Sequence, residues 1–155
     1  MPKYLSHTSM ATLFGIGNAP FAPGTVATLA AGVPVFIAVG HLSWMAQTLV
    51  ASLILVAGCV VSGNAERELG KADPSEVVID ELCGFLVGMI GHPVTLASIL
   101  AGFAFFRLFD IWKPWPVGLL DKRLHGGLGI MLDDVAAGIY ANIAGIIVLR
   151  LAGLW

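Results

Sequence analysis

The sequence predicts an all-α membrane protein, on three observations. First, its 155 residues are 57% apolar and only 12% charged, with a mean hydropathy of +0.89, whereas about a quarter of a soluble domain is charged. Second, two islands, residues 66–81 and 107–134, hold every charged residue except Lys3 and Arg150. Third, long apolar runs flank these islands. The length suits a single domain over residues 1–155.

The first half of the chain predicts a short helix, a loop and two membrane helices. Residues 8–23 are broken by glycines and prolines, which indicates a short helix that leads into an ordered loop. Residues 25–39 are apolar and end before Gly40, as is typical of a short span. Residues 45–63 form the clearest apolar run, about the ~20 residues that a spanning helix needs. We expect this helix to continue into the first charged island and to end at Gly70.

Residues 82–106 can form either one long spanning helix or a helical hairpin that turns at Gly91-His92-Pro93. Glycine and proline in close succession interrupt helices strongly. A single span would place the two charged islands more than ~30 Å apart at 1.5 Å per residue, whereas a hairpin returns the chain to the side that it left. We favour the hairpin, which lets both islands contribute to one site.

The end of the chain predicts a connection and a last membrane helix. Residues 110–134 contain prolines and glycines and are expected to form a connecting region, and the apolar residues 135–155 are long enough to span. With the hairpin, the loop at 15–24 and both islands face one compartment. That compartment is cytoplasmic by the positive-inside rule, because seven of the eight basic residues lie on its side: Lys3, Arg67, Lys71, Arg107, Lys113, Lys122 and Arg123.

Five carboxylates at the edges of apolar runs are the candidate catalytic and metal-binding residues: Asp80, Glu81, Asp110, Asp133 and Asp134. A charge at bilayer depth costs ~2.5–3.5 kcal/mol, so five acids on one membrane face suggest compensation by a cation. Favourable interaction with a helix N-terminus would explain one acid, but not all five. Oxygen donors beside Arg and Lys, without a Cys or His cluster, suit Mg²⁺ and a phosphate group. Adjacent acids on a helix point ~100° apart, so one member of each pair is expected to bind metal.

Arg107 and Lys113 are the candidate phosphate-binding cations, and Arg123 is a further one. Arg107, Asp110 and Lys113 recur every three residues and would share the face of a continuing helix. A simple ion-pair cluster around Asp110 would have the same spacing, so both interpretations stay open. The charged residues 66–68 indicate a solvated helix face.

Two glycine-bearing segments, Ala22-Pro23-Gly24-Thr25 and Gly126-Gly127-Leu128-Gly129, precede apolar runs. In one interpretation they expose backbone N–H groups to an anion at a helix N-terminus, and Gly24 and Thr25 then bind substrate. In the other, glycines permit close packing of membrane helices. The sequence alone does not separate these two roles.

The motifs resemble the phosphatidylglycerophosphatase A family. The resemblance covers essentially the whole chain in family order and is carried by Ala22 to Thr25, Asp80-Glu81, the run from Phe106 to Pro116, and the run from Asp121 to Asp134 followed by Ala137-Gly138 and Tyr140-Ala141. Departures from the family pattern are mild, such as Asn18 where serine is usual, and they leave the candidate catalytic groups in place.

The resemblance implies a magnesium-dependent bacterial lipid phosphatase of phospholipid biosynthesis. It would hydrolyse the terminal phosphate of phosphatidylglycerophosphate to give phosphatidylglycerol and phosphate, at the cytoplasmic face of the inner membrane. The family's motif acids map onto Asp80, Glu81, Asp110, Asp133 and Asp134, and its motif cations onto Arg107 and Lys113.

Other interpretations remain open at this stage. The residues alone also allow a small transporter or ion-coupled carrier that uses the acidic cluster as a cation site, although the grouping of the acids on one face counts against a pathway across the membrane. Attack by water and formation of an aspartyl-phosphate are both possible routes for a phosphatase. The expected partners are the phospholipid substrate and the bilayer. No basic patch is large enough for nucleic acid, and protein partners stay unassigned.

Overall fold

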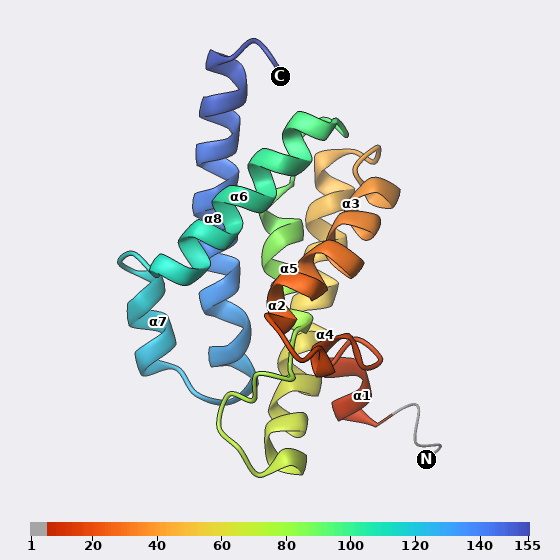
Figure 1. Cartoon of the computed structure of the whole chain (residues 1–155), viewed down its shortest axis with the longest axis vertical. Coiled ribbons are helices and arrows are strands. Elements are labelled where there is room, and N and C mark those ends of the chain that lie inside the picture. The colour runs from red at the N-terminus through yellow and green to blue at the C-terminus, as the bar shows by residue number, and fades with distance from the viewer. Residues whose placement is uncertain (1–5) are drawn as a thin grey trace.

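The computed structural model describes residues 6–155, apart from the side chains of residues 121 and 122, and this range contains helices and no strands (Figure 1). The predicted all-α class is confirmed. Lys3 and the side chain of Lys122, two of the seven basic residues expected on the cytoplasmic side, lie outside the described part. The elements in order are α1 (His7–Ala11), the 3₁₀ turn η2 (Ile16–Asn18), α2 (Pro23–Ala27), the π-helical segment η3 (Thr28–Gly32), α3 (Val33–Val39), α4 (Trp44–Leu69), α5 (Ile79–Gly88), α6 (Leu96–Trp112), α7 (Val117–Arg123) and α8 (Gly126–Leu151).

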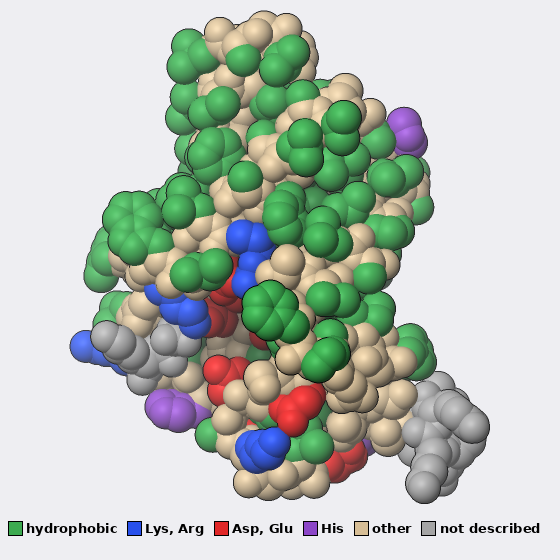
Figure 2. Space-filling model, viewed as in Figure 1, with side chains coloured by type: hydrophobic (Ala, Val, Ile, Leu, Met, Phe, Trp, Pro, Cys, Tyr) green, Lys and Arg blue, Asp and Glu red, His purple; other side chains and the backbone are tan. Residues whose placement is uncertain are grey.

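Helices α4 and α8 are each 26 residues long and apolar enough to cross a membrane. Both carry stripes of large, exposed apolar side chains at helical spacing: Leu49, Leu53, Val56 and Val60 on α4, and Ile139, Ile143 and Ile147 on α8. The residues that α4 buries are mostly small or polar, as expected for helices that pack together in lipid. Figure 2 shows apolar side chains over the upper part of the visible face, whereas charged ones gather from its middle downwards.

Helices α5 and α6 form the predicted hairpin, so the start of α5 and the end of α6 lie on the same side of the molecule (Figure 1). The turn is fixed by side chains of the two long helices. Asn142 of α8 donates to the carbonyls of Gly88 (3.0 Å) and Ile90 (2.8 Å), which satisfies orphan acceptors at the end of α5. Gln47 of α4 accepts from the Gly91 N–H at 2.9 Å.

Glycines bring the backbones of α5 and α8 into direct contact. A Cβ atom at Gly138 would lie 2.2 Å from the Gly84 carbonyl oxygen, and one at Gly84 would lie 2.6 Å from the carbonyl oxygen of Asp134. Residues four apart on a helix share a face, and Asp80 and Asp134 each stand four residues before one of these glycines. The close backbone contact therefore places the two carboxylates side by side.

The main hydrophobic core lies under the hairpin. Phe36 of α3, Phe85 of α5 and Phe106 of α6 are fully buried there, and the rings of Phe85 and Phe106 meet edge to face with centroids 6.2 Å apart. This cluster, which also includes Ala137 and Ala141 of α8, packs the hairpin against α3 and α8. The polar ends of α5 and α6 therefore extend from a well-packed core.

The prediction that residues 110–134 form a connecting region is wrong for most of that stretch. Helix α6 continues to Trp112, α7 follows, and α8 begins at Gly126. A Cβ atom at Gly127 would lie 1.8 Å from the Cys59 carbonyl oxygen, so this glycine lets α8 approach α4 and is not part of a loop. Glycine is typical of loops and of close helix packing alike, and only the contact with α4 distinguishes them.

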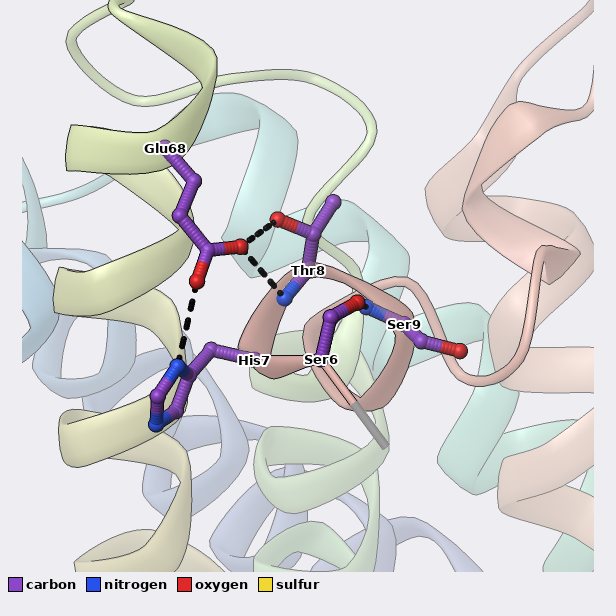
Figure 3. Close-up of polar contacts among 5 residues, drawn as sticks. All are labelled: Ser6, His7, Thr8, Ser9 and Glu68. Atoms are coloured by element: carbon purple, nitrogen blue, oxygen red, sulfur yellow. Dashed lines mark hydrogen bonds and ion pairs between the residues drawn. The ribbon is translucent and has the colours of Figure 1, made fainter. Parts of the chain in front are cut away.

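Glu68, at the end of α4, anchors the N-terminal helix α1 (Figure 3). Its Oε1 lies 3.1 Å from His7 Nδ1, and its Oε2 accepts from the Thr8 N–H at 3.3 Å and from the Thr8 hydroxyl. Arg67 and Glu68 are exposed, as predicted for a solvated helix face, and the Glu68 carboxylate in addition tethers the N-terminal helix to α4.

Candidate active site

A cavity of about 320 Å³ lies at the polar end of the bundle. Its walls come from α2, the connection between α4 and α5, the start of α5, the end of α6 and the first turns of α8. Figure 2 shows acidic and basic side chains meeting in a hollow on the visible face. Six carboxylates and two cations line the cavity: Asp73, Asp80, Glu81, Asp110, Asp133, Asp134, Arg107 and Lys113.

Three of these acids converge on one point. Oxygen atoms of Asp80, Glu81 and Asp134 lie within 4.8 Å of one another. One oxygen of each (Asp80 Oδ1, Glu81 Oε2 and Asp134 Oδ2) is buried and accepts no hydrogen bond from the described residues. Like charges this close disfavour ionisation unless a cation compensates them. An all-oxygen donor set with unsatisfied buried acceptors fits Mg²⁺, which binds one or two carboxylates and completes its shell with water and phosphate.

The electrostatics at the start of α5 agree with this. Burial raises the pKa of the Asp80 carboxyl well above its usual range, and the neighbouring Glu81 carboxylate raises it further. Burial is also the main cause of the raised pKa of Glu81, where a hydrogen bond with Asp80 acts in the opposite direction. Without a cation these carboxyls bind protons more readily than ordinary acids do, so the charged site is costly until something positive occupies it.

Each cation is held at the cavity wall by an acid. Arg107 Nη1 lies 2.7 Å from Asp110 Oδ2, one helical turn along α6, and both side chains are mostly buried. Lys113 Nζ lies 2.8 Å from Asp133 Oδ2 of α8. Lys113 also ends α6 in a left-handed conformation, with φ of +46°. The expected helical face shared by Arg107 and Asp110 is present, and Lys113 reaches the same cavity from the helix end.

The two acidic pairs behave differently from each other. Asp134 joins the cluster while Asp133 pairs with Lys113, and the expectation that one member of each pair binds metal stays a prediction. Asp80 and Glu81 both reach the cluster, although their Cα–Cβ directions diverge on the helix. The longer Glu81 side chain can curve back towards Asp80, and sequence spacing does not reveal this.

The remaining predicted site residues are placed as follows. Gly24 of α2 lines the cavity, and a Cβ atom there would lie 2.0 Å from Glu81 Oε1. This glycine therefore makes room for the Glu81 carboxylate, and its predicted contact with substrate stays a prediction. Thr25 and Arg123 are not among the residues that line the cavity, and Arg123 is exposed at the end of α7.

Sequence reasoning missed the connection between α4 and α5. Asp73, Pro74 and Ser75 line the cavity, and Asp73 has a left-handed φ of +46°. Asp73 belongs to the first charged island, so its charge alone could have marked it as a candidate site residue. Its position in an irregular segment, with no helical spacing to the other acids, left nothing in the sequence to place it beside them.

Replacing Gly24 with alanine is expected to lower catalytic activity by about 10–100-fold if Glu81 holds a metal ion, because disturbing a group that orients a metal ligand usually has that effect. The added methyl group would push against the flexible end of Glu81, so the thermal midpoint should change little. Phosphate release and thermal unfolding in detergent, measured on the same preparation, check this. Full activity would show that Glu81 need not occupy its present position.

The chain matches one family model and is similar to several known proteins. The family model described as "Phosphatidylglycerophosphatase A" matches residues 9–149. Proteins of that name from Escherichia coli and Haemophilus influenzae are each 36% identical to this chain, over 84% and 86% of it and 76% and 83% of the relative. A Bacteroides thetaiotaomicron protein, named provisionally as a phosphatidylinositol-3-phosphatase, is 38% identical over 85% of this chain and 86% of its own length. No solved structure is significantly similar to this chain.

Proposed function

The chain belongs to the phosphatidylglycerophosphatase A family, and on that basis we propose that it hydrolyses the terminal phosphate of phosphatidylglycerophosphate in a Mg²⁺-dependent reaction of phospholipid biosynthesis. Membership of the family makes the protein a phosphoric monoester hydrolase that acts on a phospholipid. The metal, the pathway and the individual residue roles are the parts that we propose.

The main support for a metal ion is the excess of acidic over basic side chains in the cavity. Six carboxylates and only two cations line a space of about 320 Å³, and a phosphate monoester brings up to two further negative charges. In its ionised form such a site would repel its substrate unless divalent cations entered with it. Three carboxylates with convergent, unsatisfied oxygens supply the ligands, so the same residues that oppose phosphate binding would attract the metal that permits it.

We assign the metal ligands to Asp80, Glu81 and Asp134, with Asp110 and Asp133 as the acids that hold the cations beside them. A bound Mg²⁺ polarises a phosphoryl oxygen and lowers the pKa of a coordinated water. The chain's own contribution is position: the glycine contact between α5 and α8 fixes Asp80 against Asp134, and Gly24 leaves room for Glu81.

Arg107 and Lys113 would bind the phosphoryl oxygens. Phosphoryl transfer needs positive groups around the equatorial oxygens, where charge is spread in the transition state. Both side chains are pinned by a carboxylate at 2.7–2.8 Å, so little side-chain entropy is lost when phosphate arrives. The guanidinium of Arg107 can offer further N–H groups while it keeps its contact with Asp110.

The same geometry supports a proposal for the location of the site. The cavity lies at the end of the bundle that carries the charged connections, while the α3–α4 and α5–α6 turns and the C-terminus lie at the other end (Figure 1). Applied to the basic residues, the positive-inside rule assigns the cavity to the cytoplasmic side. We propose the bacterial inner membrane as the location.

Removing divalent cations is expected to abolish phosphate release, and adding Mg²⁺ should restore it. Purified protein, phosphatidylglycerophosphate and a chelator are sufficient for the measurement. Zn²⁺ or Ca²⁺ should restore less activity than Mg²⁺, because the cluster offers hard oxygen donors in a small site. Undiminished activity after exhaustive chelation would contradict the metal assignment.

Substrate competition separates the remaining alternatives. Because one relative is named provisionally for phosphatidylinositol 3-phosphate, that lipid belongs beside phosphatidylglycerophosphate in the same assay. A higher kcat/KM for the phosphoinositide would replace the proposed substrate and leave the chemistry of the site intact. Cation flux in proteoliposomes without any phosphate release from lipid would instead support a transporter.

A further inference from the structure

A second hollow, of about 300 Å³, lies beside the polar cavity and is lined by Lys113, Trp115, Gly118 and Leu119. Lys113 lines both spaces, so the two are neighbours that share one wall. The polar cavity is lined mainly by charged groups, whereas beyond Lys113 the hollow is bounded by an indole ring, a glycine and a leucine. We call this second hollow the α7 groove.

The α7 groove lies at the level expected of a membrane interface. Trp112 and Trp115, on either side of Lys113, are 68% and 78% exposed, and Ile111 is 73% exposed. Exposed tryptophans next to a lysine at the end of an apolar helix are typical of the zone where headgroups meet acyl chains. The groove therefore opens where the glycerol and ester groups of a phospholipid lie.

The walls of the α7 groove are held by the spanning helix. The Tyr140 hydroxyl of α8 donates to the Trp115 carbonyl at 2.9 Å. A Cβ atom at Gly118 would lie 2.8 Å from the Lys113 carbonyl oxygen, so the first turn of α7 sits directly on the backbone that carries the lysine. The groove and the polar cavity are thus parts of one fixed structure.

We propose that the α7 groove binds the glycerol-ester end of the acyl chains of a phospholipid whose terminal phosphate occupies the polar cavity. This inference rests on the proposed function. It also rests on Lys113, which lines both spaces: its ammonium group can contact the terminal phosphate on the side of the polar cavity and the anionic phosphodiester on the side of the groove. The order of groups in such a lipid, phosphate, phosphodiester and apolar chains, then matches the order of the walls: acidic cluster, lysine and apolar groove.

A bulky side chain in the groove tests this. Leu119→Trp fills the α7 groove, and Leu100→Trp makes the same change at an exposed position twelve residues before the end of α6. Both variants and the parent protein are assayed in nanodiscs with Mg²⁺ on dihexanoyl phosphatidylglycerophosphate and on its deacylated, water-soluble headgroup. The measured quantity is the ratio of kcat/KM for the acylated substrate to kcat/KM for the deacylated one.

Leu119→Trp is expected to lower that ratio about tenfold or more, because each methylene group excluded from an apolar site costs about fourfold in affinity. Leu100→Trp should leave the ratio unchanged. An unchanged ratio in Leu119→Trp, or an equal fall in both variants, overturns the inference.

A second measurement does not depend on catalysis. A phosphatidylglycerophosphate analogue with a photoactivatable diazirine next to the acyl ester should crosslink to residues 115–119 of the parent protein and less to Leu119→Trp. Crosslinking confined to the outward stripe of α4 would overturn the groove assignment. Crosslinking at residues 115–119 by a protein that releases no phosphate would support the groove and overturn the proposed activity, so the two failures are distinguishable.

Discussion

Replacing Asp80 with asparagine is expected to lower phosphate release by about 10³-fold. Metal-assisted charge stabilisation contributes several kcal/mol to such reactions, and each 1.36 kcal/mol is a factor of ten in rate. Asparagine keeps the size of the side chain and one oxygen but removes the charge from the point where three carboxylates converge. Initial rates with saturating Mg²⁺ and phosphatidylglycerophosphate measure the effect.

Stability gives the Asp80→Asn variant a second readout. The three clustered acids repel one another, so the variant should unfold at the same temperature as the parent protein in chelator, or higher. Mg²⁺ at a hundred times its dissociation constant should stabilise the parent by about 2.7 kcal/mol and the variant much less. Glu76→Gln, which removes an acid from an exposed ion pair with Lys71 at 3.0 Å, is the matched control and should change neither quantity appreciably. Full activity of Asp80→Asn would refute the metal site.

Replacing Gly138 with alanine is expected to destabilise the protein by at least ~1–3 kcal/mol, the usual cost of overpacking. The new methyl group would lie 2.2 Å from the Gly84 carbonyl oxygen, and a helix backbone cannot move aside as a side chain can. Helices α5 and α8 must then separate, which moves Asp80 away from Asp134. A displacement of about 1 Å can cost 10²-fold in rate, so activity should fall even in the fraction that stays folded.

Gly88→Ala is the matched control for this interface. Its Cβ atom would lie 3.4 Å from the Gly138 carbonyl oxygen and 3.5 Å from the Ala141 Cβ, which is ordinary contact, so stability and activity should be close to those of the parent. Thermal unfolding in detergent and phosphate release test both variants. Equal behaviour of Gly138→Ala and Gly88→Ala would show that close backbone contact does not position the acids.

The charged residues of the cavity were predictable from the sequence because lipid makes charge expensive. Asp80, Glu81, Arg107, Asp110 and Lys113 interrupt or flank apolar runs, and only a site that needs them justifies that cost. The hairpin was predictable for a related reason: the Gly91-to-Pro93 turn breaks the one run whose unbroken form would have separated the charged islands. Asp73 escaped prediction because an irregular connection has no periodicity from which to place a side chain.

The sequence by itself indicated that this chain is helical, that it is apolar enough to associate with a membrane and that its acids and most of its cations belong to one polar end, because composition and periodicity report directly on solvent and secondary structure. Only the tertiary structure decided which acids converge. Asp134 joins Asp80 and Glu81 while Asp133 turns to Lys113, and this division depends on the rotation and depth of α8 against α5. Those are set by contacts between glycine backbones far apart in the chain, which local sequence patterns do not record.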